Sequence, residues 1–330
     1  MNRKIKILCT IGPKSLKKDV ISYFLKNNVD IFRINMSHTS ITELRNKIKY
    51  LKKLRVKNIC IDTEGAQVRT SNSRKKFLKR NTIVILNKFN SNKKGIQLYP
   101  NFNFNSIKVN SIIKIGFEGL ELKVLKKTDY QINTKVIKQG VIDNNKGVHF
   151  NQKITLDSLT AKDLEAIELG KELKIKYFAL SFANSLTDVK YFRNLIGNKS
   201  FLISKIETKS GYKNIKKITK NSNAILIDRG DLSRYYPVET IPIMQKLILK
   251  VAKSFRKDCY IATNLLESMI INFYPTRAES NDIFSSLESG AKGLVLAAET
   301  AIGNYPKECV DFVNKCIIKR YNFKNLKKIY

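Results

Sequence analysis

The sequence has few histidines: only His38 and His149 occur among its 330 residues. Two histidines exclude a His-rich metal centre and an HExxH metalloprotease site. The sequence also has no CxxC, GxSxG or GxxxxGKS pattern. These absences exclude paired-cysteine metal sites, the nucleophile elbow of serine hydrolases and the phosphate-binding P-loop.

The cysteines are also few and show no pairing pattern. Their number is odd and they are spread along the chain, at Cys9, Cys60, Cys259, Cys309 and Cys316. The N-terminal apolar stretch, IKILC, is too short for a signal peptide, and no segment reads as membrane-spanning. We therefore expect reduced, mostly buried thiols and a cytoplasmic protein.

Acidic residues are scarce, with 27 Asp and Glu against 62 Lys and Arg, giving a formal charge of +35. Such a charge raises nucleic acid or an anionic membrane as partners. The lysines, however, are scattered over the whole length, and the one dense run, residues 74–80, has a single aromatic and no RNA-binding signature. We predict no specific nucleic-acid partner and no membrane partner.

Eight short apolar runs of strand length recur along the chain. They lie at residues 5–10, 29–35, 58–63, 177–182, 201–207, 224–228, 259–263 and 293–299. The runs are continuous rather than alternating, which is typical of strands buried on both faces of a parallel sheet. Stretches of helical period lie between most of them, such as 159–173 and 238–255. This alternation predicts a (β/α)₈ TIM barrel, with an open doubly wound sheet as the alternative.

This alternation of strand-like and helical stretches is interrupted once, between about residues 70 and 154. Short alternating runs stand there between Asn, Gly and Lys clusters: NTIVILN, NSIIKIG, LELKVL and YQINTKVI. We expect residues 1–70 and 155–330 to form the barrel, and residues 71–154 to form a small β-rich domain inserted after the third barrel strand. An insertion in a βα loop would lie over the active site as a lid.

Polar residues follow most of the predicted strands, at the end where barrel enzymes place their chemistry. They are Arg33 to His38, Asp62 to Gly65, Lys205 and Glu207, Asp228 to Asp231, Thr263, and Glu299 with Thr300. Glu207 and Asp231 are suited to Mg²⁺, which proteins hold through one or two carboxylates. Lys205 and Arg33 beside such a metal would form a pocket for a phosphate or carboxylate.

With these residues in view, the chain resembles the pyruvate kinase family. KILCTIGPKS (6–15) and FRINMSH (32–38) are similar to its first barrel segments, and IDTEGAQVRT (61–70) to its DTKGPEIRT. ISKIE (203–207) and DRGDLS (228–233) resemble its catalytic-lysine strand and ARGDLG, and ATNLLESMI (262–270), PTRAESND (275–282) and LAAETAIGNYPKECV (296–310) follow in family order. The insertion takes the place of the family's mobile lid domain.

The resemblance implies transfer of a phosphoryl group from phosphoenolpyruvate to ADP, giving pyruvate and ATP. It implies Lys205, Arg33 and Thr263 as catalytic residues, with Gly230 and Asp231 also binding the substrate. Glu207 and Asp231 would hold Mg²⁺. The positions matching the potassium set are Asn35, Ser37, Asp62 and Thr63, and those on the nucleotide side are Pro13, Asn35, His38 and Arg69.

Several positions depart from the family pattern. Gln67 replaces a glutamate that complements the monovalent cation, so K⁺ dependence is an open question. Ala297 and Ala298 replace Ser-Gly, and Asp228 replaces a small neutral residue beside the metal loop. The family's C-terminal regulatory domain has no counterpart in these 330 residues, so we expect no sugar-phosphate activation and at most a homodimer through the barrel rather than a tetramer.

Two alternatives to a pyruvate kinase stay open. The first is a related enzyme that applies metal-enolate chemistry to another phosphoenolpyruvate or 2-oxo acid substrate in a specialised pathway. The second, suggested by the charge alone, is a non-catalytic protein that binds a polyanion.

Overall fold

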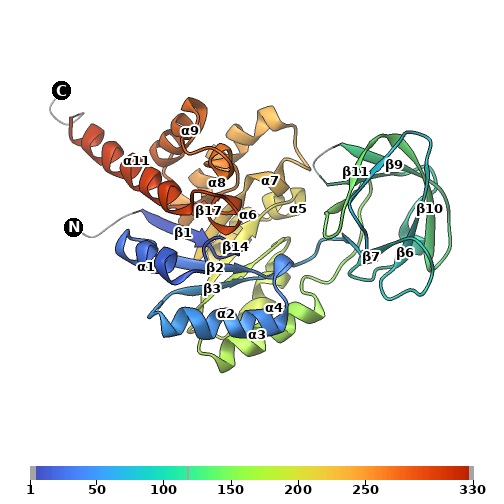
Figure 1. The fold of residues 1–330 in the computed structure, drawn as a ribbon, viewed down its shortest axis with the longest axis horizontal. Helices are drawn as coiled ribbons and strands as arrows, with labels where there is room; N and C mark the ends of the chain where they lie inside the picture. The colour runs from blue at the N-terminus through green and yellow to red at the C-terminus, as the bar shows by residue number, and fades with distance from the viewer. Residues whose placement is uncertain (1–4, 117–118, 327–330) are drawn as a thin grey trace. The chain divides into compact units, whose positions relative to one another are not determined.

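The computed structural model describes residues 5–116 and 119–326 and divides into two compact units (Figure 1). The first unit comprises Met1–Gly65 and Ala161–Tyr330, and the second comprises Ala66–Thr160. The predicted insertion, residues 71–154, lies within the second unit.

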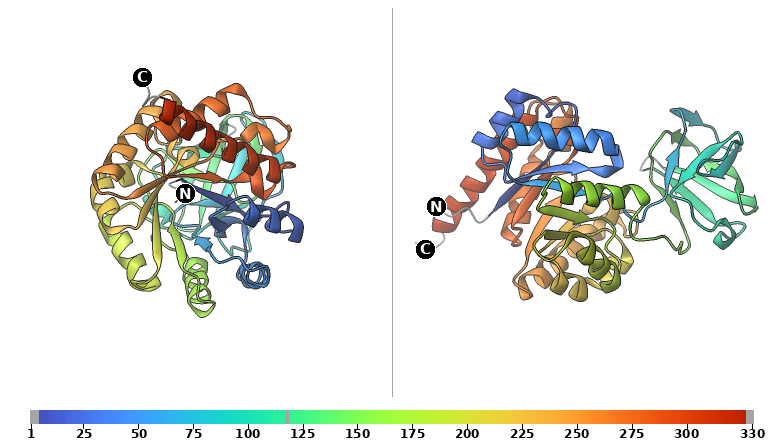
Figure 2. Two further views of the ribbon diagram at one scale, coloured as in Figure 1. Left: turned by 90° about the vertical axis from the view of Figure 1, so that its left-hand side faces the viewer. Right: turned by 90° about the horizontal axis from the view of Figure 1, so that it is seen from below.

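Parallel strands close into an eight-membered barrel in the first unit (Figure 2). In chain order they are β1 (Lys6–Thr10), β2 (Ile31–Asn35), β3 (Ile59–Asp62), β13 (Tyr177–Leu180), β14 (Phe201–Ile206), β15 (Ala224–Asp228), β16 (Asp258–Ala262) and β17 (Gly293–Leu296). Around the barrel their order is β1-β17-β16-β15-β14-β13-β3-β2. The predicted TIM barrel is therefore confirmed, and the open sheet is excluded because β1 pairs with both β2 and β17.

The barrel strands are apolar because both of their faces are covered. Every residue of β3, β15 and β17 is buried. The interior is packed with side chains of unequal size: Tyr260 is fully buried, and a Cβ on the neighbouring Gly293 would lie 2.5 Å from its ring. Gly293 thus makes the space that the tyrosine ring fills.

Helices surround the strands on the outside of the barrel (Figure 2, left). They are α1 (Lys18–Lys26), α2 (Ile41–Lys53), α3 (Ala161–Glu172), α4 (Leu186–Ile196), α5 (Lys209–Lys213), α6 (Ile215–Asn221), α7 (Arg229–Leu232), α8 (Ile241–Ser254), α9 (Arg277–Glu288), α10 (Ala298–Ala301) and α11 (Pro306–Leu326). Short 3₁₀ turns are η1 (Met36–His38), η3 (Val238–Thr240) and η4 (Glu267–Ile270). The helix predicted at 238–255 therefore begins later than expected, because its first three residues form η3.

The second unit is built on an antiparallel-rich sheet of seven strands in the order β12-β8-β9-β10-β6-β7-β4, with β11 and β5 forming a separate pair. Its strands are β4 (Arg69–Ser71), β5 (Lys76–Leu78), β6 (Ile83–Lys88), β7 (Ile96–Tyr99), β8 (Ile112–Ile115), β9 (Leu120–Lys127), β10 (Gln131–Lys138), β11 (Gly140–Ile142) and β12 (Val148–Phe150); the 3₁₀ turn is η2 (Phe104–Ser106). The four runs that the sequence predicts correspond to β6, β8, β9 and β10. Alternate residues of β9 and β10 point into an apolar core of this unit's own.

All five cysteines are thiols rather than disulfides, and four of them are buried, as predicted. Across the part of the chain that the structure describes, the helices are too short or too polar to cross a membrane.

Candidate active site

The polar residues at the strand ends meet at one mouth of the barrel, as the topology requires. Asp62 ends β3 and Asp228 ends β15, while Glu207 directly follows β14. Asp62 stands opposite Asn35 of β2 and Ala179 of β13 in the strand register. Side chains far apart in the sequence are thereby brought to the same rim.

Lys205 is the centre of this cluster. Its ammonium Nζ lies 2.9 Å from Glu207 Oε1, 3.4 Å from Asp62 Oδ2 and 3.6 Å from Asp228 Oδ2. It also donates a hydrogen bond of 3.1 Å to Ser181 Oγ, at the end of β13. Lys205 is only 5% exposed, so one buried cation is shared among three carboxylates.

Arg33 provides the second buried cation. Its Nε donates to Asp62 Oδ2 at 2.5 Å, and one terminal nitrogen donates to Thr10 Oγ1 at 2.7 Å. The other oxygen of Asp62 accepts a hydrogen bond of 3.1 Å from Ser181 Oγ. Asp62, at the end of β3, is therefore a shared partner of Arg33 on β2 and Lys205 on β14.

The buried cations and carboxylates shift one another's pKa values. Burial alone would raise the pKa of Asp62, but the charges of Arg33 and Lys205 hold it below its usual range. Burial disfavours the ammonium form of Lys205, yet the surrounding carboxylates raise its pKa above the usual range. Burial raises the pKa of both Glu207 and Asp228, because the attraction of Lys205 only partly offsets the loss of water.

The Glu207, Asp228 and Asp231 carboxylates form a cluster that fits a divalent cation. Each offers an oxygen, and these oxygens lie within 4.8 Å of one another. Glu207 Oε2 accepts the amide of Phe182 at 2.5 Å, and its buried Oε1 faces the Lys205 ammonium at 2.9 Å. Carboxylate oxygens are the hard ligands that Mg²⁺ or a similar ion prefers. The donor set therefore fits the metal that the resemblance implies.

Thr263 follows β16 and is held in an unusual conformation. Its φ is +68°, a left-handed value that is rare for a β-branched residue. Its hydroxyl accepts the Gly230 amide at 2.8 Å, and its carbonyl accepts from the Arg229 guanidinium at 2.5 Å. Arg229 in turn binds Asp282 of α9 through two contacts of 2.6 and 2.8 Å. The Arg229–Asp282 pair thus stabilises a strained strand end at the rim of the site.

The residues predicted for potassium are engaged in local hydrogen bonds. Asn35 Oδ1 accepts the Ser37 amide at 3.1 Å. Thr63 Oγ1 donates to the Ala179 carbonyl at 3.2 Å and accepts the Ser181 amide at 3.0 Å. Gln67 is buried in the second unit. A potassium site stays a prediction.

The residues predicted for the nucleotide lie on different parts of the chain. Pro13 follows β1 and is exposed, and His38 is the exposed last residue of η1. Arg69 begins β4 in the second unit. Their contact with a nucleotide stays a prediction.

Sequence reasoning missed three residues that organise the site. Thr10 and Ser181 bind Arg33 and Lys205 directly, as described above. Asp163 of α3 accepts the backbone amides of Glu64 and Gly65 at 2.8 and 3.0 Å, which anchors the loop after β3. The signal for Thr10 and Ser181 was their position at the ends of strands β1 and β13, but single hydroxyl residues at strand ends are too common to be selective.

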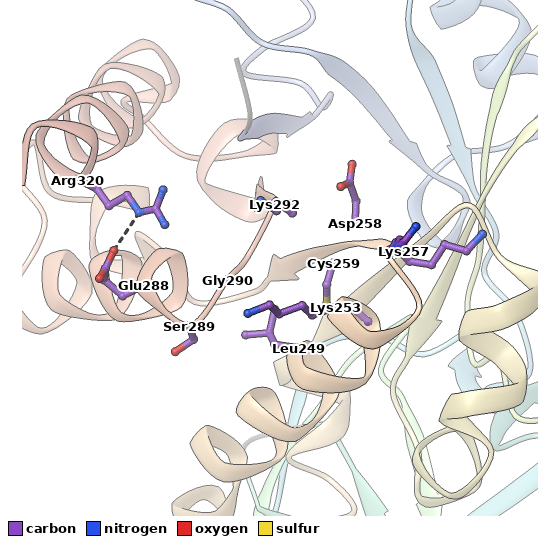
Figure 3. Close-up of a pocket in the computed structure, with 12 residues that line it drawn as sticks. Leu249, Lys253, Lys257, Asp258, Cys259, Glu288, Ser289, Gly290, Lys292 and Arg320 are labelled. Atoms are coloured by element: carbon purple, nitrogen blue, oxygen red, sulfur yellow. Dashed lines mark hydrogen bonds and ion pairs between the residues drawn. The ribbon is translucent and has the colours of Figure 1, made fainter. Parts of the chain in front are cut away.

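A cavity of about 400 Å³ lies at the opposite end of the barrel (Figure 3). Its lining comes from the residues that precede β16 and β17 and from the ends of the neighbouring helices, including Lys253, Lys257, Asp258 and Lys292. None of the predicted site residues lines it. The carboxylate cluster, rather than this cavity, is the candidate active site because it has the buried charges and the convergent polar groups.

Comparison with known proteins agrees with the geometry. Residues 2–310 match the model of the pyruvate kinase barrel domain. The chain is 35% identical over 326 residues to a pyruvate kinase of Thermotoga maritima, covering 95% of this chain and 70% of that protein. It is 35% identical over 321 residues to a pyruvate kinase of Methanocaldococcus jannaschii (96% and 69% covered) and 31% identical over 346 residues to one of Agrobacterium vitis (99% and 70%). The chain belongs to the pyruvate kinase family and is an enzyme of the phosphotransferase class.

Proposed function

We propose that this enzyme transfers the phosphoryl group of phosphoenolpyruvate to ADP, in a reaction that depends on a divalent cation such as Mg²⁺. One observation carries the proposal: a buried lysine and a buried arginine stand at the barrel mouth beside a carboxylate cluster that fits a divalent ion. Phosphoryl transfer requires little covalent help from the protein and depends on positioning and electrostatic stabilisation. Fixed cations next to a metal site are suited to that task.

We assign to Lys205 the stabilisation of the negative charge on the phosphoryl group during its transfer. Its raised pKa keeps it an ammonium group, and its carboxylate neighbours and Ser181 hold Nζ in place before substrate arrives. A pre-oriented charge costs no reorganisation during the reaction, which is why such groups contribute strongly to catalysis.

Arg33 is assigned to the phosphate of the substrate. A guanidinium has five N–H donors, and the contacts with Asp62 and Thr10 leave some of them for an anion. Thr263 and the backbone around Gly230 and Asp231 are assigned to the substrate carboxylate. Because the Gly230 amide donates to Thr263 Oγ1 in this structure, that amide would have to exchange partners when the substrate binds.

Glu207 and Asp231 would hold the divalent cation, and Glu207 is oriented for this by the Phe182 amide. When bound, the cation would supply positive charge that neutralises the phosphate and polarises the substrate oxygens. K⁺ dependence is a separate question, since Gln67 lacks the charge of the glutamate it replaces. Activity measured with and without K⁺ at constant ionic strength would answer it.

The test is steady-state turnover with phosphoenolpyruvate, ADP and Mg²⁺, with pyruvate followed by coupled reduction with lactate dehydrogenase. We expect Lys205→Met to lower kcat at least hundredfold. Lys250→Met, at an exposed position of α8, is the matched control and should retain full activity. Turnover that is absent in the parent protein, or equal in Lys205→Met, would refute the proposal.

One observation favours a second candidate, a related enzyme acting on another phosphoenolpyruvate or 2-oxo acid substrate. A carboxylate oxygen of Asp228 lies beside Gly230, since a Cβ added to this glycine would stand 3.5 Å from Oδ1, and the substrate carboxylate is assigned to the backbone there. Such a neighbour changes which anion is accepted. Decarboxylation of oxaloacetate or enolisation of pyruvate, in a protein that fails to turn over ADP, would favour this candidate.

A further inference from the structure

Asp228 is a buried carboxylate of the cluster to which the proposed function assigns no role of its own. It is the last residue of β15, it is 6% exposed, and it stands three residues before Asp231. Its position lets it reach both Lys205 and the cluster formed with Glu207 and Asp231.

The two oxygens of Asp228 have different surroundings. Oδ2 faces Lys205 Nζ at 3.6 Å, which is an ion pair rather than a hydrogen bond. Oδ1 is buried and accepts no hydrogen bond from any residue in the described part of the chain. A buried acceptor without a donor is unfavourable, because it has lost its water and gained no partner in exchange. An occupant that supplies positive charge to Oδ1 would remove this cost.

The local charge count points to a cation as that occupant. Three carboxylates, those of Asp62, Glu207 and Asp228, face the two buried cations Lys205 and Arg33. When all three are ionised, as ligation of a cation requires, one negative charge is uncompensated before Asp231 is considered. Asp231 has a cation of its own in Arg234, whose Nε lies 3.1 Å from its Oδ1.

We propose that Asp228 is a third carboxylate ligand of the divalent cation, beside Glu207 and Asp231. The proposal deepens the metal site of the proposed function and rests on it. It commits to a hard ion that accepts carboxylate oxygens, such as Mg²⁺ or Mn²⁺. It also makes Asp228 a determinant of how strongly this protein holds its metal.

The third carboxylate has opposite effects on the metal and on an anionic substrate. It adds attraction for the cation, so the metal binds more tightly. It also cancels one positive charge of the metal-loaded site, so phosphoenolpyruvate binds more weakly than it would without Asp228. Removing Asp228 should therefore weaken metal binding and strengthen substrate binding, which a purely structural residue would not do.

The experiment is calorimetric titration of the metal-free full chain with Mn²⁺, without any substrate. Asp228→Ala and Asp228→Asn should each raise the Kd for Mn²⁺ at least fivefold. The matched control is Asp258→Asn, which also removes one carboxylate, at the far end of the barrel where Asp258 pairs with Lys6 at 3.3 Å. The control should leave the Kd within twofold of the parent value.

Folding is checked by the thermal midpoint of the metal-free proteins. Asp228→Asn should raise it, because an uncompensated buried charge is removed.

In the Mn²⁺-saturated proteins, Asp228→Ala should lower the Kd for phosphoenolpyruvate at least twofold.

A change of less than fivefold in the Mn²⁺ Kd of either Asp228 variant would overturn the proposal and leave Asp228 as a counter-ion of Lys205. A phosphoenolpyruvate Kd that rises in Asp228→Ala would also overturn it. Because the metal titration needs no turnover, a parent protein that binds Mn²⁺ through Asp228 but transfers no phosphoryl group would refute only the proposed function.

Discussion

The ammonium group of Lys205 lies 2.9 Å from the carboxylate of Glu207, two residues further along the chain and directly after β14, and both side chains are buried. Residues two apart in extended chain face the same side, so the end of β14 and the residue after it present this pair together at the mouth of the barrel. The pair sets the charge balance of the whole site, because Asp62 and Asp228 share the same lysine.

Removing Lys205 should destabilise the protein as well as inactivate it. Lys205→Met leaves Arg33 to balance the three buried carboxylates that Lys205 contacts, and breaking a buried ion pair in this way costs about 3–5 kcal/mol. Urea unfolding of the metal-free protein measures the loss in the free energy of unfolding. Lys250→Met should unfold like the parent. An equally small effect of Lys205→Met would show that the three carboxylates are not all ionised at the same time.

The Arg229–Asp282 pair should act on catalysis through the position of Thr263. Arg229→Lys removes the planar guanidinium, of which one terminal nitrogen donates to Asp282 while Nε and the other terminal nitrogen donate to the Thr263 carbonyl. Because the strain at Thr263 is about 1–3 kcal/mol, the strand end should relax, and kcat should fall about tenfold at full metal saturation. The coupled assay would show this as a change in kcat with metal affinity unaltered.

Asp282 provides the control for that result. Asp282→Glu keeps the negative charge facing Arg229 and should retain most of the parent kcat. Asp282→Ala should lower kcat as much as Arg229→Lys does. If all three variants had the same kcat as the parent, the position of Thr263 would not depend on the pair.

Metal removal should lower stability in the absence of substrate. A cation that binds only the folded protein stabilises it by about 2.7 kcal/mol at a concentration one hundred times its Kd. Chelation with EDTA should therefore lower the thermal midpoint, and Mg²⁺ or Mn²⁺ should restore it. NaCl at equal ionic strength separates binding from screening: full restoration by NaCl would contradict a specific metal site.

Asp163 should contribute to stability through the loop after β3. Asp163→Ala leaves the Glu64 and Gly65 amides without this acceptor, at a cost of about 1–3 kcal/mol. Asp163→Asn keeps one carbonyl acceptor and should lose about half as much. Urea unfolding compares the two, and equal stability of both variants with the parent would mean that water replaces the carboxylate.

The barrel could be predicted from the sequence because its signal is local. Each of the eight strands is an apolar run that is buried on both faces, and the run is visible whatever the neighbours are. The small strands β4, β5, β7, β11 and β12 were not predicted. They are three or four residues long, and pairing with distant partners, such as β4 with β7, defines them rather than any pattern of their own.

The sequence by itself determined which residue types follow each strand, and therefore that Lys205, Glu207 and Asp231 lie at the barrel mouth. It could not determine which of them touch. Closure of the barrel brings Thr10, Arg33, Asp62 and Ser181 together from four strands, because neighbouring strands in the sheet are set by long-range pairing. Only the tertiary structure decided that one lysine is shared by three carboxylates and that an oxygen of Asp228 has no donor among the described residues, since both depend on distances between strands that are remote in the chain.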